Sequence, residues 1–290
     1  MSEKVVWFNG EMTPAEKASV SVFDHGLLYG DGVFEGIRAY NGRILKLRSH
    51  LKRLFNGASR IELNIAFTIE QLEQAVRATC NANQIRNGYI RLCVTRGTGY
   101  LGLNPKLCEK SNTFIIADSI TLYPAEMYET GMPIITAKTM RNHPAAMDPA
   151  VKSMNYLNNI LAKLEAVKAN VPEALMLNWK NNVSECTGDN IFMISGGKLT
   201  TPPLSACPLP GITRALVIEL ARKADLPVAE EDFTLDTLYG ADEIFLTGTA
   251  AEVIPVTKID DKTIADGKPG PITGQLIAAF KQLVADAPED

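Results

Sequence analysis

Residues 29–38 read YGDGVFEGIR and decide how the first half of the chain is interpreted. The residues of 33–40 alternate as in a strand, so Phe34, Gly36 and Arg38 share one face. An aromatic wall, an empty space and a cation then follow in order, as in the floor of a pocket. A tight sheet contact at Gly36 beside a solvated Arg38 explains the same pattern equally well.

Strand and helix patterns interleave on both sides of this stretch. Asn9-Gly10 predicts a hairpin turn, Thr68-x-x-Gln71 predicts a capping box, and Tyr89 and Arg91 repeat the aromatic-plus-cation alternation on another strand. The predicted strands are 5–9, 33–40, 89–95, 113–117, 133–138, 173–178, 190–195 and 243–247. The predicted helices begin near 49 and 68 and cover 155–169, 212–225 and 272–284.

This interleaving predicts an α/β fold, of mixed α+β type. A chain of 290 residues suggests two domains at about 150 residues each. We expect an N-terminal α/β domain over 1–118, an interdomain loop over 119–132 and a C-terminal α/β domain over 133–290 that contains Lys152.

The composition excludes several classes of protein. The 29 Lys+Arg and 33 Asp+Glu give a net charge of −4, which disfavours nucleic acid and anionic membranes as partners. No apolar run is long enough for a transmembrane helix and no signal peptide is visible, so we expect a cytoplasmic protein. Five cysteines without a C-x-x-C pair and three histidines indicate reduced thiols and no metal site.

Gly97-x-Gly99-x-x-Gly102 matches a dinucleotide-binding fingerprint but stands in the wrong context. It follows a strand, yet residues 103–106 do not open a helix whose N-terminus could hold a pyrophosphate. We interpret it as a loop whose backbone bends or approaches a neighbour closely.

Two side chains are candidates for covalent or acid-base chemistry. Lys152 lies where a helix is expected to begin, with Leu157, Ile160, Leu161 and Leu164 as the buried stripe of that helix. Most lysines are solvated surface residues, but a desolvated Lys152 could bond to a carbonyl, with the Tyr156 phenol nearby. Glu185 is expected in a turn of small residues, where an exposed acid is the simpler interpretation.

Two further segments could bind an anion through the backbone. Pro210-Gly211 opens a helix with N–H groups at Ile212 and Thr213, and residues 247–251 form a small-residue turn after a strand. Any helix start has the first property, so each signal is modest alone.

Taken together, these motifs resemble the fold-type IV, class IV aminotransferases that use pyridoxal 5′-phosphate (PLP), and most closely the branched-chain amino-acid aminotransferases. The resemblance covers nearly the whole chain and implies their two-domain architecture. The motifs that carry it stand in family order: FDHG at 23–26, YGDGVFEGIR at 29–38, KSMNYLNN at 152–159, GITR at 211–214 and TGTAAE at 247–252.

The resemblance implies a role for each matching residue toward PLP. Lys152 would bond to the cofactor and move the substrate Cα proton, Glu185 would bind the pyridine nitrogen, and Tyr156 would lie near the ring oxygen. The expected phosphate-binding residues are Arg53, Ile212, Thr213 and Thr249.

The resemblance also implies the substrates, which are branched-chain L-amino acids and 2-oxoglutarate, and a homodimer or higher homo-oligomer. The residues expected to bind substrate are Tyr29, Phe34, Gly36, Arg38, Tyr89, Arg91, Thr249 and Ala250. Cys186 departs from the family pattern by standing where a glycine is expected. Tyr123 is the nearest match to a family tyrosine of the interdomain loop.

Other activities of the same fold are alternatives: a D-amino-acid aminotransferase, an (R)-selective amine transaminase, an aminodeoxychorismate lyase or a non-catalytic PLP-binding protein. The loop after the second pocket strand, residues 96–102, lacks the histidine of the D-enzyme pattern. A non-catalytic protein would be expected to have lost Lys152 or Glu185, and both are present.

Overall fold

The computed structural model describes residues 4–286, which form two compact units. Of these residues, unit 1 comprises 4–120 and 151–156, and unit 2 comprises 121–150 and 157–286. The short segment 151–156 therefore belongs to unit 1, although its neighbours in the chain belong to unit 2. No sequence signal marked this return. The expected mixed α/β fold is confirmed.

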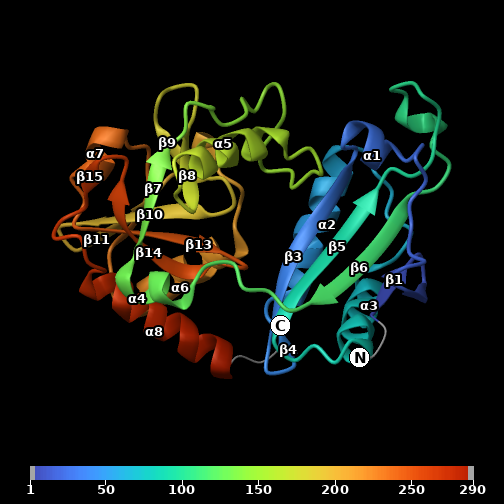
Figure 1. Ribbon diagram of the computed structural model, residues 1–290, viewed down its shortest axis with the longest axis horizontal. Coiled ribbons are helices and arrows are strands. Elements are labelled where there is room, and N and C mark those ends of the chain that lie inside the picture. The colour runs from blue at the N-terminus through green and yellow to red at the C-terminus, as the bar shows by residue number, and fades with distance from the viewer. Residues whose placement is uncertain (1–3, 287–290) are drawn as a thin grey trace. The chain divides into compact units, whose positions relative to one another are not determined.

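Unit 1 contains a six-stranded antiparallel sheet with the order β2-β1-β6-β5-β3-β4 (Figure 1). The Asn9-Gly10 turn between β1 and β2 has positive φ at both residues, as the predicted hairpin requires. The strands are β1 (Val5–Phe8), β2 (Glu11–Pro14), β3 (Gly32–Tyr40), β4 (Arg43–Ile44), β5 (Gly88–Thr95) and β6 (Asn112–Asp118).

Two long helices cover one face of this sheet. The Thr68 side chain accepts a bond from Gln71 N, and Gln71 returns one to Thr68 N, which is the predicted capping box. Leucines of both helices pack on the odd-numbered residues of β3, such as Val33 and Ile37. The helices of unit 1 are α1 (His25–Tyr29), α2 (Leu47–Arg60), α3 (Ile69–Ala82) and the 3₁₀ turn η1 (Pro105–Leu107). The opposite face of β3 carries its even-numbered residues.

Unit 2 contains a nine-stranded mixed sheet with the order β12-β11-β10-β13-β14-β7-β8-β9, and β15 pairs with β14. Its strands are β7 (Met132–Thr136), β8 (Glu173–Leu177), β9 (Val183–Cys186), β10 (Asn190–Ser195), β11 (Lys198–Thr201), β12 (Val228–Glu230), β13 (Glu243–Gly248), β14 (Glu252–Ile259) and β15 (Lys262–Thr263). Its helices are α4 (Ala125–Thr130), α5 (Leu157–Lys168), η2 (Leu204–Ala206), α6 (Ile212–Lys223), α7 (Leu235–Tyr239) and α8 (Pro271–Asp286). The helix α4 lies within the stretch 119–132 that the sequence predicts as a loop.

The helix α5 buries a different face from the expected one. The expected buried stripe, which is Leu157, Ile160, Leu161 and Leu164, is 46–60% exposed. The buried positions are instead Asn159, Ala162 and Ala166. The two alanines pack with Ala174 and Met176 of β8, because small side chains let the helix approach the sheet closely.

Five strands of unit 2 were not predicted from the sequence: β9, β11, β12, β14 and β15. β9 is fully buried but contains the polar residues Ser184 and Glu185, so it lacks the apolar pattern by which buried strands are predicted. β14 contains Pro255, which argues against a central strand, but its parallel pairing with β7 begins only at Val256. Among the described residues, no helix combines the length and apolarity needed to cross a membrane.

Candidate active site

The open face of the unit 1 sheet gathers most of the expected substrate residues. Gly36 pairs with Arg91, and Arg38 pairs with Tyr89, so these four side-chain positions lie on the same face as Phe34. The Arg91 guanidinium lies 4.6 Å from the Phe34 ring centre and donates a 3.3 Å hydrogen bond to Tyr89 Oη. The structure thus brings the expected aromatic wall and cation together.

Gly36 is required here by the approach of Tyr89. A Cβ atom at this position would collide with the Tyr89 hydroxyl. The Tyr89 phenol therefore occupies the space that a side chain at position 36 would fill. The tight contact at Gly36 and the pocket on this face are thus one feature.

Lys152 does not lie at the start of a helix, as the sequence suggested, because α5 begins only at Leu157. Its segment is bound to β3: Phe34 N donates to Lys152 O at 3.0 Å, and Met154 N donates to Gly32 O at 2.8 Å. The Lys152 Nζ atom donates to Tyr156 Oη at 2.8 Å and lies 4.4 Å from the Phe34 ring centre. Lysine, phenol and aromatic ring form one cluster.

Tyr29 and Arg53 lie at two other places in unit 1. Tyr29 ends α1, where its ring contacts the ring of His25 edge to face at 5.0 Å. Arg53 projects from α2 and forms two hydrogen bonds of 2.7 Å with the buried carboxylate of Glu35. Glu35 also bonds to His50 Nδ1 at 2.7 Å. Sequence analysis did not single out Glu35 or His50.

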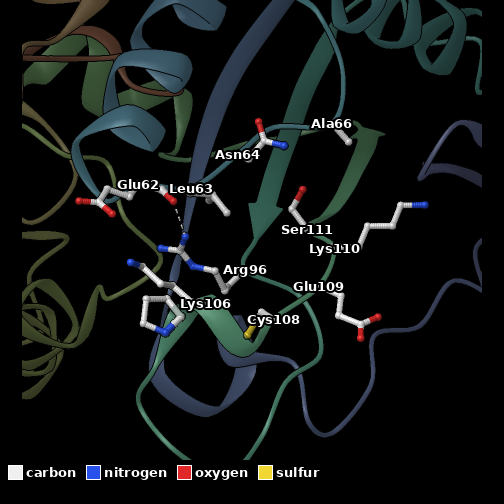
Figure 2. Close-up of a pocket in the computed structure, with 11 residues that line it drawn as sticks. Glu62, Leu63, Asn64, Ala66, Arg96, Lys106, Cys108, Glu109, Lys110 and Ser111 are labelled. Atoms are coloured by element: carbon white, nitrogen blue, oxygen red, sulfur yellow. Dashed lines mark hydrogen bonds between the residues drawn. The ribbon is translucent and has the colours of Figure 1, made fainter.

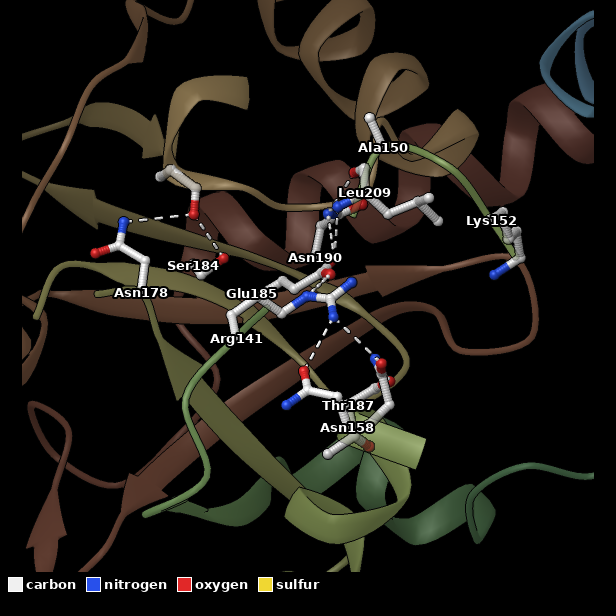
Figure 3. Close-up of polar contacts among 12 residues, drawn as sticks. Arg141, Ala150, Lys152, Asn158, Asn178, Ser184, Glu185, Thr187, Asn190 and Leu209 are labelled. Atoms are coloured by element: carbon white, nitrogen blue, oxygen red, sulfur yellow. Dashed lines mark hydrogen bonds and ion pairs between the residues drawn. The ribbon is translucent and has the colours of Figure 1, made fainter. Parts of the chain in front are cut away.

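Glu185 lies on β9 and is buried, in contrast to the expected exposed turn (Figure 3). One carboxylate oxygen accepts a 2.8 Å bond from Arg141 Nε, and the other accepts bonds from Leu209 N at 2.9 Å and Asn190 Nδ2 at 3.3 Å. Sequence analysis missed Arg141, which is 5% exposed. Its only sequence signal is indirect, because a buried carboxylate requires a cation or donors nearby.

The start of α6 offers backbone donors. Its N-cap is Gly211, and no side chain among the described residues caps the N–H groups of Ile212 and Thr213. A Cβ at Gly211 would collide with the amide oxygen of Asn190, so only glycine fits there.

Thr249 and Ala250 lie in the three-residue turn that joins β13 to β14, where Gly248 pairs with Glu252. The preceding Thr247 is 1% exposed and pairs with Asn190 across β10 and β13. Among residues 4–286, its hydroxyl finds no hydrogen-bond partner. Such an orphan hydroxyl is costly unless something else satisfies it.

A second group of buried acids lies close to Glu185 in unit 2. Asp189 accepts a 3.0 Å hydrogen bond from Tyr123 Oη, and Glu173 accepts one from Thr187. Burial and the charge of Glu173 raise the pKa of Asp189 to about 7, although the Tyr123 bond opposes them. Burial also raises the pKa of the Cys186 thiol well above its usual value, so this cysteine is an inert packing group.

Unit 1 also contains a pocket of about 220 Å³ that none of the expected site residues line (Figure 2). Arg96 lies in its wall, but its donors are used by Asp31, Ile61 O and Glu62 O. Gly97, beside Arg96, has φ 91° and packs on the Lys110 carbonyl, as expected of a bent glycine loop. We assign no function to this pocket.

Residues 32–259 match the family described as amino-transferase class IV. The chain belongs to this family. A protein named putative branched-chain-amino-acid aminotransferase from Methanocaldococcus jannaschii is 47% identical over 96% of both chains. The branched-chain-amino-acid aminotransferase of Escherichia coli strain K12 is 35% identical over 98% of this chain and 94% of its own.

Solved structures agree with these relatives. A crystal structure of Escherichia coli branched-chain amino acid aminotransferase has a TM-score of 0.95 and 34% identity, covering 98% of this chain and 95% of that one. The branched-chain amino acid aminotransferase from Thermobaculum terrenum in its PLP-form has a TM-score of 0.88 and 31% identity, covering 97% of this chain and 94% of that one.

Proposed function

We propose that the chain catalyses PLP-dependent transamination between the branched-chain L-amino acids leucine, isoleucine and valine and 2-oxoglutarate. The products are the branched-chain 2-oxo acids and L-glutamate. The observation that carries the proposal is the hydrogen bond between Lys152 Nζ and Tyr156 Oη beside the Phe34 ring. It belongs to a chain that matches branched-chain aminotransferases over nearly its full length.

Three features of unit 2 fit PLP as the cofactor. The uncapped start of α6 suits a phosphate, because N–H groups and the helix dipole both favour an anion there. The buried Thr247 hydroxyl lacks a partner among the described residues. The Glu185 carboxylate, braced by Arg141, suits a protonated pyridine nitrogen.

Bound PLP supplies an electron sink for the charge that develops on the substrate Cα. Lys152 would hold the cofactor at rest, and its Nζ atom, once the substrate amine has displaced it, would be the free base that carries the proton to and from the substrate Cα. The Tyr156 hydroxyl accepts the Lys152 hydrogen bond and keeps the amine in place. Glu185 would keep a proton at the pyridine nitrogen, and Arg53, Ile212, Thr213 and Thr249 would hold the phosphate.

The substrate residues follow from the same proposal. Phe34 and the tyrosines Tyr29 and Tyr89 receive the aliphatic side chain, while Gly36 leaves the space. Thr249 and Ala250 offer backbone donors to the α-carboxylate. Arg91 or Arg38 receives the distal carboxylate of glutamate, because charge-assisted bonds strengthen where water is excluded.

The visible absorption of the purified protein tests the reaction directly. A cofactor band that shifts on adding L-leucine and returns on adding 2-oxoglutarate supports the proposal. D-alanine and a simple chiral amine serve as controls for the alternative activities of this fold. A response to either control but not to L-leucine would replace the proposed substrate, and a protein without any cofactor band would contradict the reaction.

The proposal includes a homodimer as the minimum assembly and a cytoplasmic location. The exposed stripe of α5, with Leu161 and Leu164 46% exposed, supports association with a second copy. Five cysteines without a disulfide, all within residues 4–286, support a reducing compartment. Light scattering tests the assembly: Leu161→Glu should weaken it, and Gln275→Glu on α8 should not. A monomeric wild-type protein would refute it, and cell fractionation tests the location.

A further inference from the structure

Glu35, His50 and Arg53 form a buried polar network between β3 and α2. Both Glu35 oxygens are used: Oε1 accepts from Arg53 Nε, and Oε2 accepts from Arg53 Nη2 and bonds to His50 Nδ1, each at 2.7 Å. Glu35 is fully buried, and the side chains of His50 and Arg53 are 3% and 11% exposed. Sequence analysis assigned Arg53 a role and gave the other two none.

The charges within this network are fixed by their neighbours. Burial alone would raise the pKa of Glu35, but Arg53 and His50 outweigh burial and lower it to about 2. Burial lowers the pKa of His50, and the charges of Arg53 and Lys152 lower it further, although Glu35 opposes them. Glu35 is therefore a carboxylate and Arg53 a cation, and a neutral His50 donates from Nδ1.

The fold alone gives little reason for such a network. Val33 and Ile37 on the same face of β3 pack against Leu51 and Leu54 of α2. An apolar group at position 35 could pack in the same way, because burying an ion pair costs about as much as the pair returns. The network is better explained by what it does to Arg53.

The two-point bond fixes the plane of the Arg53 guanidinium. With Nε and Nη2 both bonded to Glu35, rotation about the last side-chain torsions is blocked and the remaining N–H directions are set. Burial lowers the pKa of Arg53, but the Glu35 carboxylate, with smaller contributions from Tyr156 and Tyr89, outweighs burial and raises it. Arg53 is thus near the two phenols of the Lys152 and Arg91 cluster.

We propose that Glu35 and His50 are positioning residues that hold Arg53 in one orientation for the phosphate group of the cofactor. The inference rests on the proposed function, in which Arg53 binds that phosphate. Glu35 holds the guanidinium, and His50 holds the second oxygen of Glu35. The conformational entropy of the Arg53 side chain is then lost on folding, so its loss does not weaken binding of the cofactor.

The test compares PLP with pyridoxal, which lacks the phosphate, by titrating each into the full-length protein after cofactor removal. Glu35→Asp keeps the charge but is one methylene shorter, so it cannot bond Arg53 at two points and reach His50. We expect PLP binding to weaken about 3- to 10-fold and pyridoxal binding to stay unchanged, the scale of one newly mobile side chain. Glu73→Asp is the matched control. Glu73 of α3 bonds to Arg48, which lies on α2 as Arg53 does, but this pair is more exposed.

Each outcome separates the proposals. Equal weakening of PLP and pyridoxal would mean that the network only supports the fold, and tighter PLP binding would mean that Glu35 screens Arg53; either result overturns the inference. If Glu35→Asp does not fold, His50→Gln gives the same comparison. Arg53→Met tests the underlying assignment: if it leaves the preference for PLP over pyridoxal intact, the phosphate role of Arg53 fails, whatever Glu35 does.

Discussion

The residues assigned to cofactor and substrate are of different kinds in the two units. Unit 1 presents side chains, with Lys152 and Tyr156 on one segment and Arg91 on the open sheet face. Unit 2 presents the Glu185 carboxylate and the Thr247 hydroxyl, and otherwise backbone N–H groups at the start of α6 and in the turn after β13. Substitution removes side chains but leaves backbone donors in place. Function should therefore be sensitive to substitution in unit 1 and, apart from Glu185, Thr247 and Gly211, more tolerant in unit 2.

The buried acids of the two units differ in the same way. Glu35 in unit 1 faces a cation and a histidine, and its pKa falls to about 2. Asp189 in unit 2 faces a phenol and a second carboxylate, and its pKa rises to about 7. Burial raises the pKa of both carboxyls; Arg53 and His50 reverse that shift at Glu35, whereas the Glu173 charge adds to it at Asp189.

The largest expected effect is that of Lys152→Ala. No other amine in unit 1 lies beside Tyr156 and Phe34 among the described residues. We expect transamination to fall by about 10³-fold or more, because the group that carries the Cα proton is lost. Turnover is measured with L-leucine and 2-oxoglutarate, and thermal unfolding checks the fold. Near-native turnover would show that another lysine does the chemistry.

Glu185→Gln tests the exception in unit 2. The amide can still accept a hydrogen bond but cannot hold a charge opposite Arg141 or a protonated pyridine nitrogen. We expect the single-turnover rate to fall on the order of 10²-fold while PLP stays bound, the scale of losing one well-placed electrostatic contact. Loss of the cofactor at an unchanged rate would assign Glu185 to binding and not to electronic tuning.

Arg91→Met separates the two amino acids that share the pocket. If Arg91 receives the distal carboxylate of glutamate, kcat/KM should fall more for glutamate than for leucine. The difference in transition-state stabilisation should be about 2–4 kcal/mol. Equal losses would indicate that Arg91 organises the whole sheet face through Phe34 and Tyr89. An unaffected glutamate reaction would move the role to Arg38.

The pH dependence of stability tests the contrast between the acids. Because folding raises the pKa of Asp189, its contribution is present below about pH 4 and lost as the pH rises through 7. The contribution of Glu35 has the opposite sign: it is present above about pH 4.5 and lost as the pH falls toward 2. Asp189→Asn should stabilise the protein by about 2–4 kcal/mol more at pH 8 than at pH 4. Equal changes at both pH values would show that Asp189 is ionised when buried.

The smallest effect is expected at Ile212. Its contribution to the phosphate site is a backbone N–H, which Ile212→Val retains. We expect the Kd for PLP to change less than about threefold, well under 1 kcal/mol. A larger loss would mean that the side chain shapes the site and that unit 2 is not built mainly from backbone donors.

Local patterns predicted the parts of the molecule that depend on neighbours in the chain. Alternation located β3 and β5 and placed Gly36 with Phe34 and Arg91 with Tyr89, and the capping box located the start of α3. These signals are complete within a few residues.

Contacts between distant residues were not predictable in this way. The burial of Glu185 depends on Arg141, 44 positions away. The exposed stripe of α5 depends on the alanines that β8 happens to meet. Glu35 was not predicted as the partner of Arg53, because a charged residue in a strand is expected on the exposed face. Glu35 instead lies on the buried face of β3.

The return of residues 151–156 to unit 1 has a consequence for synthesis. A ribosome releases residues 4–120 first, but two backbone groups of β3, Phe34 N and Gly32 O, take their partners from Lys152 and Met154. At about 5–20 residues per second, those partners follow residue 120 after roughly 2–7 s. Until then the nascent sheet has a vacant flank, and its candidate nucleophile is still being made. The Lys152 amine therefore joins the sheet only after β3, β5 and β6 have all been made.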